Sequence, residues 1–150
     1  MKKEVAIEKM KAYCAYQERC QQEVYEKLRK LSIYGNEADD ILMELISENF
    51  LNEERYAEAY ASGKFRIKSW GRVKIKQGLK AKNISEFCIK KALAEIDNQE
   101  YEEKLNKLVF KLYDKYNFMN DFDKKGKVAT RLMQKGYEPN LIWDLLNRKN

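Results

Sequence analysis

The chain has 150 residues, a formal net charge of +6 and no histidine; 36% of its residues are charged, and 44% are apolar or aromatic. This length suits one domain or a short array of repeats, and the apolar content is too high for a disordered chain. Without histidine the commonest general base and metal ligand are missing, and no glycine-rich phosphate loop is present. We therefore expect neither an enzyme nor a metal or other cofactor.

The sequence also bears on where the protein works. No run approaches the ~20 apolar residues of a membrane span, and the first ten residues lack the apolar centre of a signal peptide. The cysteines, Cys14, Cys20 and Cys88, are odd in number and lack CxxC spacing, so we interpret them as small apolar residues. These features predict a cytoplasmic protein with no membrane segment, and we expect an elongated monomer.

The apolar residues repeat with a period near fifty. Steps of 51 and then 53 residues carry seven positions of the first third of the chain onto the other two thirds. Twenty of these 21 positions are apolar or aromatic, and the exception, Lys149, lies at the C-terminus. The positions are Val24, Leu28, Ile33, Ala38, Ile41, Leu42, Leu45, Ile75, Leu79, Ile84, Ile89, Ala92, Leu93, Ile96, Val128, Leu132, Tyr137, Ile142, Leu145, Leu146 and Lys149.

This period divides the chain into three units, 1–49, 50–97 and 98–150, and each unit carries the pattern of three helices. Three short helices bury little surface alone, whereas stacked units share a core. The predicted fold is all-α, an elongated, curved array of three tandem three-helix repeats. In chain order, the helices are expected at 3–15, 19–31, 36–48, 52–66, 71–82, 85–96, 99–117, 122–135 and 138–148.

Residue types that begin or end helices occur at the edges of these segments. We expect N-caps, a proline at a first helical position, and glycines just after helices. The N-caps are Asn52, Ser85 and Asn36, the last in a capping box with Asp39; the proline is Pro139; the glycines are Gly35 and Gly136.

The densest positive stretch runs from Lys64 to Lys82 and contains eight basic residues and no acid. On a helix, Arg72, Lys76 and Lys80 form one outward stripe. Like charges at this spacing destabilise an isolated helix, so the stripe gains most when a polyanion or an acidic protein lies opposite. A solvated helix face is the alternative interpretation. The candidate binding residues are Lys64, Arg66, Lys68, Trp70, Arg72, Lys74, Lys76, Lys80 and Lys82.

Two further basic rows are expected in the third unit. Acids lie beside the first row, so a solvated face remains the favoured interpretation there. The first row is Lys104, Lys107, Lys111 and Lys115, and the second is Lys127, Arg131 and Lys135.

Several side chains near the basic stretch have a structural interpretation. Trp70 is interpreted as an anchor at the start of a helix, with base stacking as the alternative. The stripe of Tyr56, Tyr60 and Phe65 is predicted to lie in the core. Arg55 is expected to pair with the glutamates beside it in sequence. Two pairs of acids in the chain could in principle bind magnesium, but helix capping explains them more simply.

Residues 50–85 resemble the central signature of the RecX regulatory proteins; they read FLNEERYAEAYASGKFRIKSWGRVKIKQGLKAKNIS. Residues 14–28, CAYQERCQQEVYEKL, resemble the first signature of that family. The resemblance covers residues 12–96, and in the third unit it rests on the apolar pattern alone. Cys20 stands where the family often has serine, so we expect the helix that follows to be capped in another way.

The resemblance implies a non-enzymatic, all-helical protein of three three-helix repeats. It implies binding to the RecA recombinase, in the groove of its filament on single-stranded DNA. It also implies restraint of the ATPase and strand-exchange activities of RecA in recombination and DNA repair. The alternative from the residues alone is a general nucleic-acid-binding helical module that contacts phosphates through its basic face. The sequence leaves open whether that face meets DNA or RecA.

Overall fold

The computed structural model describes residues 1–148, and this part of the chain contains nine α-helices and no strand. Each helix lies within a few residues of one predicted from the sequence. Lys149, the exception in the apolar repeat, lies outside the described residues. The helices are α1 (Lys3–Tyr16), α2 (Gln21–Lys30), α3 (Gly35–Ser47), α4 (Glu53–Lys68), α5 (Arg72–Ala81), α6 (Glu86–Ala94), α7 (Asn98–Lys115), α8 (Asp121–Gln134) and α9 (Pro139–Arg148).

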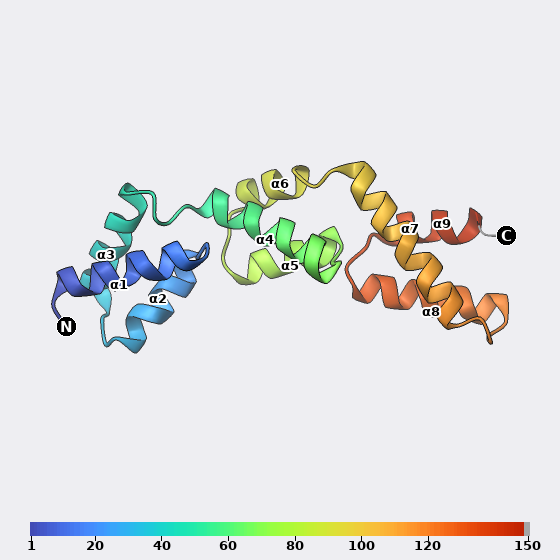
Figure 1. The fold of residues 1–150 in the computed structure, drawn as a ribbon, viewed down its shortest axis with the longest axis horizontal. Coiled ribbons are helices and arrows are strands. Elements are labelled where there is room, and N and C mark those ends of the chain that lie inside the picture. The colour runs from blue at the N-terminus through green and yellow to red at the C-terminus, as the bar shows by residue number, and fades with distance from the viewer. Residues whose placement is uncertain (149–150) are drawn as a thin grey trace.

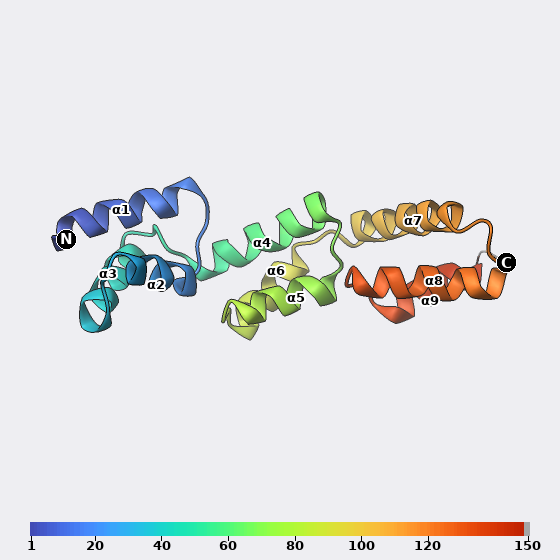
Figure 2. The ribbon, with the colours of Figure 1, turned by 90° about the horizontal axis from the view of Figure 1, so that it is seen from below.

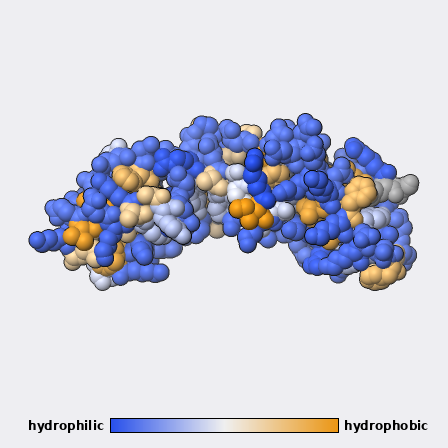
Figure 3. Space-filling view, in the orientation of Figure 1, coloured by the Kyte–Doolittle hydropathy of each residue, from blue (hydrophilic) through white to orange (hydrophobic). Residues whose placement is uncertain are grey.

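The helices pack in three successive groups, which we call the first, second and third repeats. In the first repeat α3 packs on α1 and α2, in the second α4 packs on α5 and α6, and in the third α7 lies against α8 and α9. Figures 1 and 2 show the groups in a row, with the chain ends at opposite ends of the long axis. The outline in Figure 3 is a shallow arch whose visible face is largely hydrophilic. The fold is the all-α helical repeat that the apolar spacing predicts.

The positions that repeat in the sequence form the core. Of the 20 described positions, 18 are buried, and Leu93 and Leu145 pack partly buried against them. Burying a side chain of this size contributes roughly 1.5–3 kcal/mol relative to its exposed state. The fifty-residue period is therefore the period of the buried face of one three-helix unit.

The core divides into two clusters rather than three. The first repeat has its own cluster, which also includes Leu51. The second and third repeats share one continuous cluster, and Cys20 from the first repeat joins it. The second and third repeats are thus joined through apolar packing.

The junction between the first and second repeats is largely polar. The Arg55 guanidinium donates to Glu18 Oε2 at 2.6 Å and to the Asn49 carbonyl at 3.0 Å. The Asn83 side-chain amide donates to Gln22 Oε1 at 2.9 Å. These contacts join α4 and α5 to the segment around the start of α2.

The expected pairing of Arg55 with its neighbours in sequence is wrong. The adjacent Glu53 accepts the backbone N–H of Ser85 at 2.6 Å, and Glu54 pairs with Lys91. Both glutamates face α6, which packs on α4. Arg55 lies on the side that faces the first repeat, so its partner comes from there.

The junction between the second and third repeats includes backbone hydrogen bonds. The Gly71 N–H donates to the Lys135 carbonyl at 2.8 Å, and the Val73 N–H donates to the Gly136 carbonyl at 2.9 Å. The start of α5 is thereby fixed against the turn between α8 and α9.

Most helix ends follow the predicted signals. The Asn52 and Ser85 side chains cap α4 and α6. Pro139 is the first residue of α9. Gly136 follows α8 with φ +96°, a conformation that glycine adopts without a side-chain penalty.

The start of α3 differs from the prediction. The helix begins at Gly35, so Asn36 lies inside it and does not form the expected capping box. Asp39 instead accepts a hydrogen bond from the Tyr25 hydroxyl of α2 at 2.6 Å. Ser32 follows α2 in the left-handed conformation, with φ 61°, and Gly35, with φ 57°, is left-handed too but is the first residue of α3. A tertiary contact therefore replaces the local cap.

The cysteines behave as the sequence predicts. All three are buried and free, and burial is the main cause that raises the pKa of the Cys14 and Cys20 thiols. Cys20 is the N-cap of α2, and its backbone N–H donates to Glu23 Oε1 at 3.0 Å. Cys20 and Glu23 thereby form a capping box, in which Cys20 takes the place of the usual serine, so the expectation of a different cap is wrong.

Candidate functional site

The predicted basic stretch forms the end of α4, a tight turn and all of α5. α4 ends at Ser69, whose φ of 58° is left-handed, and the Trp70 N–H donates to the Lys64 carbonyl at 3.1 Å. The chain then reverses into α5 at Arg72. The turn brings this segment beside the third repeat.

Arg72 does not belong to an outward stripe, and that prediction is wrong. Its guanidinium donates to Glu138 Oε2 at 2.9 Å and to Asn98 Oδ1 at 2.7 Å. It also lies over the Tyr101 ring, 3.7 Å from the centroid. All three partners belong to the third repeat, so Arg72 joins two repeats. A helical wheel of α5 alone contains no sign of these partners.

Other residues of the stretch have acidic partners at the surface. Arg66 pairs with Glu100 at 3.6 Å, Lys80 with Glu86 at 3.5 Å and Lys82 with Glu23 at 3.8 Å. The exposed pairs, Arg66–Glu100 and Lys80–Glu86, are of a kind that typically stabilises a protein by about 0–1 kcal/mol. Lys68 and Lys76 are exposed.

Trp70 is an anchor within the second repeat. Its half-buried ring packs against the shared core, with the Tyr60 ring edge-on at a centroid distance of 6.4 Å. The ammonium groups of Lys64 and Lys74 lie over the Trp70 ring, 4.9 and 4.5 Å from its centroid. These cation–π contacts use the ring faces that base stacking requires, so the structure favours the anchor interpretation. Tyr56 and Phe65 of the predicted aromatic stripe are buried.

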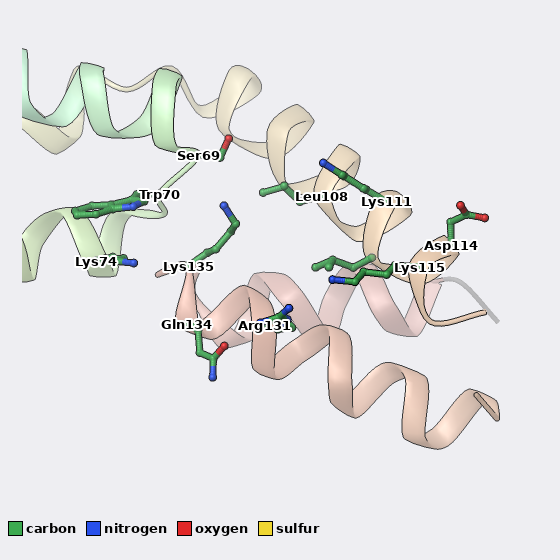
Figure 4. Close-up of a pocket in the computed structure, with 11 residues that line it drawn as sticks. Ser69, Trp70, Lys74, Leu108, Lys111, Asp114, Lys115, Arg131, Gln134 and Lys135 are labelled. Atoms are coloured by element: carbon green, nitrogen blue, oxygen red, sulfur yellow. The ribbon is translucent and has the colours of Figure 1, made fainter. Parts of the chain in front are cut away.

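A groove of about 780 Å³ lies between the α4–α5 turn and helices α7 and α8 (Figure 4). Its lining contains five basic residues and one acid. In Figure 4 the Asp114 carboxylate points away from the groove at its outer end. We call this feature the basic groove; it is lined by Ser69, Trp70, Lys74, Leu108, Lys111, Leu112, Asp114, Lys115, Arg131, Gln134 and Lys135.

Like charges are held close together in the basic groove. Burial, followed by the charges of Lys74, Lys111 and Lys104, lowers the pKa of Lys135 below its ordinary value of 10.5. The Lys135 ammonium donates to the Lys68 carbonyl at 3.3 Å, across the junction between repeats. Since the protonated form of Lys135 is disfavoured, an anion in the groove would relieve a repulsion already present.

The groove takes residues from all three predicted basic rows but leaves others outside. Lys74 comes from the main stretch, Lys111 and Lys115 from the first row of the third unit, and Arg131 and Lys135 from the second. Two of the remaining members, Lys107 and Lys127, are exposed and do not line it. Lys104 donates instead to the carbonyls of Phe65 and Arg66 at 3.1 and 3.2 Å, at the C-terminal end of α4, where a cation is favoured.

Two family models match the chain. The second three-helix domain of RecX matches residues 52–93, and the third three-helix domain of RecX matches residues 99–146. The chain belongs to the RecX family. The match to the third repeat goes beyond the sequence resemblance, which rested there on the apolar pattern alone.

Relatives and solved structures agree with this family. Proteins named Regulatory protein RecX from Streptococcus uberis and Clostridium tetani are 30% and 33% identical to the chain, over 131 and 132 residues. These matches cover 87% and 85% of the chain but 50% and 59% of the relatives. The chain thus spans about half the length of the curated relatives it matches. The crystal structure of RecX from Lactobacillus salivarius superposes with a TM-score of 0.87 at 27% identity, covering 97% of this chain and 95% of that one.

The residues that carry the RecX signature here are mainly structural. Asn52 caps α4, Arg55 joins the first and second repeats, and Gly71 and Arg72 join the second and third. In this chain, these signature residues therefore begin a helix or connect the repeats. The groove-lining residues Leu108, Leu112 and Gln134 were missed by the sequence analysis, because neither charge nor a motif marks them and only the packing of two repeats brings them to one surface.

Within residues 1–148, no group of three His, Cys, Asp or Glu side chains could hold a metal ion. In the same part of the chain, no helix combines the length and apolar character needed to cross a membrane.

Proposed function

We propose that this chain is a non-enzymatic regulator that binds the RecA recombinase filament on single-stranded DNA and restrains the ATPase and strand-exchange activities of RecA. The protein acts in the cytoplasm as an elongated monomer. Membership of the RecX family supports the regulatory role, and the row of repeats suits contact along a filament.

The basic groove is the observation that carries the proposal. Five cationic side chains from the second and third repeats converge there, and one of them, Lys135, has a pKa lowered by burial and by other lysines. Such a site gains most from a ligand that brings several negative charges at once, as DNA phosphates do. A nucleoprotein filament presents these phosphates together with protein.

The test compares RecA-driven ATP hydrolysis and strand exchange with and without the purified chain. The groove variant carries Lys74→Glu, Lys111→Glu and Lys135→Glu. Its matched control carries the same change of charge at exposed lysines that do not line the groove: Lys76→Glu, Lys80→Glu and Lys107→Glu. We expect the wild-type chain and the control to inhibit both activities at a low ratio to RecA, and the groove variant to lose inhibition.

Unchanged RecA activities in an excess of the wild-type chain would overturn the proposal. Equal loss of inhibition in the groove variant and the control would mean that net charge, rather than the groove, determines binding. Melting curves for both variants separate loss of binding from loss of fold.

A general nucleic-acid-binding module is the second candidate, and the concentration of lysines in one groove favours it. It predicts salt-steep binding to bare DNA, since each phosphate contact releases counterions. A pull-down on RecA filaments and on bare single-stranded DNA, across a salt series, separates the two functions. Equal binding to both, without inhibition of RecA, would favour the general module.

A further inference from the structure

Two aromatic rings lie in solvent between the end of α7 and the first turn of α8. Phe118 is 80% exposed, and Phe122, in the first turn of α8, is 86% exposed. A large apolar ring that finds no place in the core gains free energy when a partner covers it. The contacts and charges around Tyr116, which packs on Phe118, indicate the kind of partner.

Phe118 is connected to the basic groove through Tyr116. The guanidinium of Arg131, which lines the groove, donates to the Tyr116 hydroxyl at 3.2 Å. The Tyr116 ring meets the Phe118 ring edge-on, with centroids 6.5 Å apart and planes inclined by 65°. The exposed ring is therefore two contacts away from a cation of the groove.

The surroundings of the Tyr116 ring are positive. The ammonium groups of Lys115 and Lys127 lie 5.5 and 5.9 Å from the centroid of the Tyr116 ring. The hydrogen bond from Arg131 is the main cause that lowers the pKa of the Tyr116 hydroxyl, and the charges of both lysines add to it. An acidic partner would thus be attracted to the same place at which a flat ring is exposed.

We propose that Phe118, supported by Tyr116, stacks against a base of a single-stranded nucleic acid whose phosphates lie in the basic groove. The inference rests on the proposed function and deepens it, because it names the polymer that this groove contacts. A single strand offers negative phosphates and unstacked bases together, whereas a duplex hides its base faces and an acidic protein surface supplies only the charge.

Phe118 and the basic groove are suited to contact different parts of a nucleic acid strand. Trp70 lies at the other end of the groove, and two lysines already cover its ring. Phe118, which is linked to Arg131 of the groove through Tyr116, is largely open to solvent. Phosphates bound in the groove would therefore supply the part of the affinity for the strand that depends on salt. Stacking of a base on Phe118 would supply a part that salt does not screen.

The test measures the affinity of the full chain for two short oligonucleotides across a salt series. One is oligo(dT), and the other has the same sugar–phosphate backbone with abasic sites in place of the bases. Phe118→Ala removes the ring, and Phe118→Tyr restores a flat ring. Phe87→Ala is the control, since Phe87 is also exposed (71%) but lies on α6.

We expect Phe118→Ala to weaken oligo(dT) binding by about fivefold or more, the usual result of losing one stacked base. The slope of affinity against salt should not change, and binding to the abasic strand should equal that of wild type. Phe118→Tyr should bind oligo(dT) as wild type does, and Phe87→Ala should have no effect on either ligand.

Equal losses on the two oligonucleotides, or no loss on oligo(dT), would overturn the stacking role, as would a wild-type chain that does not bind oligo(dT). The RecA assay, run on the same preparations, keeps this result separate from the proposed function. If Phe118→Ala loses RecA inhibition while its oligo(dT) affinity is unchanged, the ring contacts protein instead. If the wild-type chain inhibits RecA but does not bind bare oligo(dT), the proposed regulatory function is supported and the stacking role of Phe118 is rejected.

Discussion

Gly71 and Gly136 lie backbone to backbone where the second repeat meets the third. A Cβ atom placed on Gly71 would overlap the carbonyl group of Gly136, and one placed on Gly136 would overlap the backbone of Lys74. Only glycine allows this approach, which forms the two hydrogen bonds between α5 and the α8–α9 turn.

Gly71→Ala is therefore expected to destabilise the chain by about 1–3 kcal/mol, because backbone must move to admit the methyl group. Gly63→Ala is the matched control: Gly63 lies inside α4, and a Cβ atom there meets no other atom within 4 Å. That change should be neutral or stabilise the helix by up to about 1 kcal/mol. Thermal and urea unfolding measure the stabilities of the Gly71→Ala and Gly63→Ala variants. Similar stabilities for the two variants would mean that the close approach is relaxed in solution.

Arg72→Ala should also weaken the junction, by about 2 kcal/mol, since it leaves the half-buried Glu138 carboxylate without its cation. Arg72→Lys keeps the charge but cannot reach Glu138, Asn98 and the Tyr101 ring at once. It should therefore recover only part of the loss. The free energy of unfolding, taken from urea denaturation, measures the difference. Full recovery with lysine would contradict a role for the guanidinium geometry.

Lys135→Gln should stabilise the folded chain at neutral pH while weakening its binding to polyanions. Repulsion from each neighbouring lysine destabilises the folded chain by roughly 0.2–0.5 kcal/mol. Added salt screens this repulsion, so it should reduce the stability gained by the substitution. A melting series in low and high salt measures this effect. A variant less stable than wild type in low salt would show that the hydrogen bond to Lys68 outweighs the repulsion.

The same substitution gives a pH test with a defined sign. The pKa of Lys135 in the folded chain is lower than its ordinary value of 10.5, so the folded state binds fewer protons than the unfolded state between the two values. Protonated Lys135 therefore destabilises the folded chain at pH values below its folded-state pKa, and this loss of stability disappears as the pH rises towards 10.5. The stability advantage of Lys135→Gln over wild type should therefore shrink over that range.

Arg55→Ala should loosen the first repeat selectively. It removes the partner of Glu18, and the first repeat keeps a separate core. We expect faster amide exchange in α1–α3, with little change in α4–α9. Arg66→Ala is the control, because its pair with Glu100 is exposed and spans 3.6 Å. Equal loss of protection in all three repeats would contradict a separate first repeat.

The features that the sequence predicts correctly depend on interactions between residues close together in the chain. The apolar period located the buried faces, and the caps at Asn52 and Ser85 depend on atoms within three residues. The helix positions followed from these signals to within a few residues. The two failures nearby have one cause, because both partners are distant in sequence. Glu18, the partner of Arg55, lies in the loop between α1 and α2, and Tyr25, the partner of Asp39, lies on α2.

The groove itself could not be predicted in this way. Arg72 has a partner 66 residues away, at Glu138, and this contact removes it from the stripe that its helical spacing suggested. Lys74, Lys111 and Lys135 meet only because two repeats pack at a fixed angle. The sequence did identify the basic segments that form the groove, but it contained no sign of which lysines would converge.

The unequal division of the core has a consequence for how the molecule responds to its surroundings. The six helices α4–α9 share apolar packing and carry the whole basic groove, so we expect them to respond to solvent conditions as one unit. The first repeat is held to that body largely by ion pairs and amide contacts, which salt and charged ligands weaken. Added salt should therefore loosen the three N-terminal helices before it loosens the part of the chain that carries the groove.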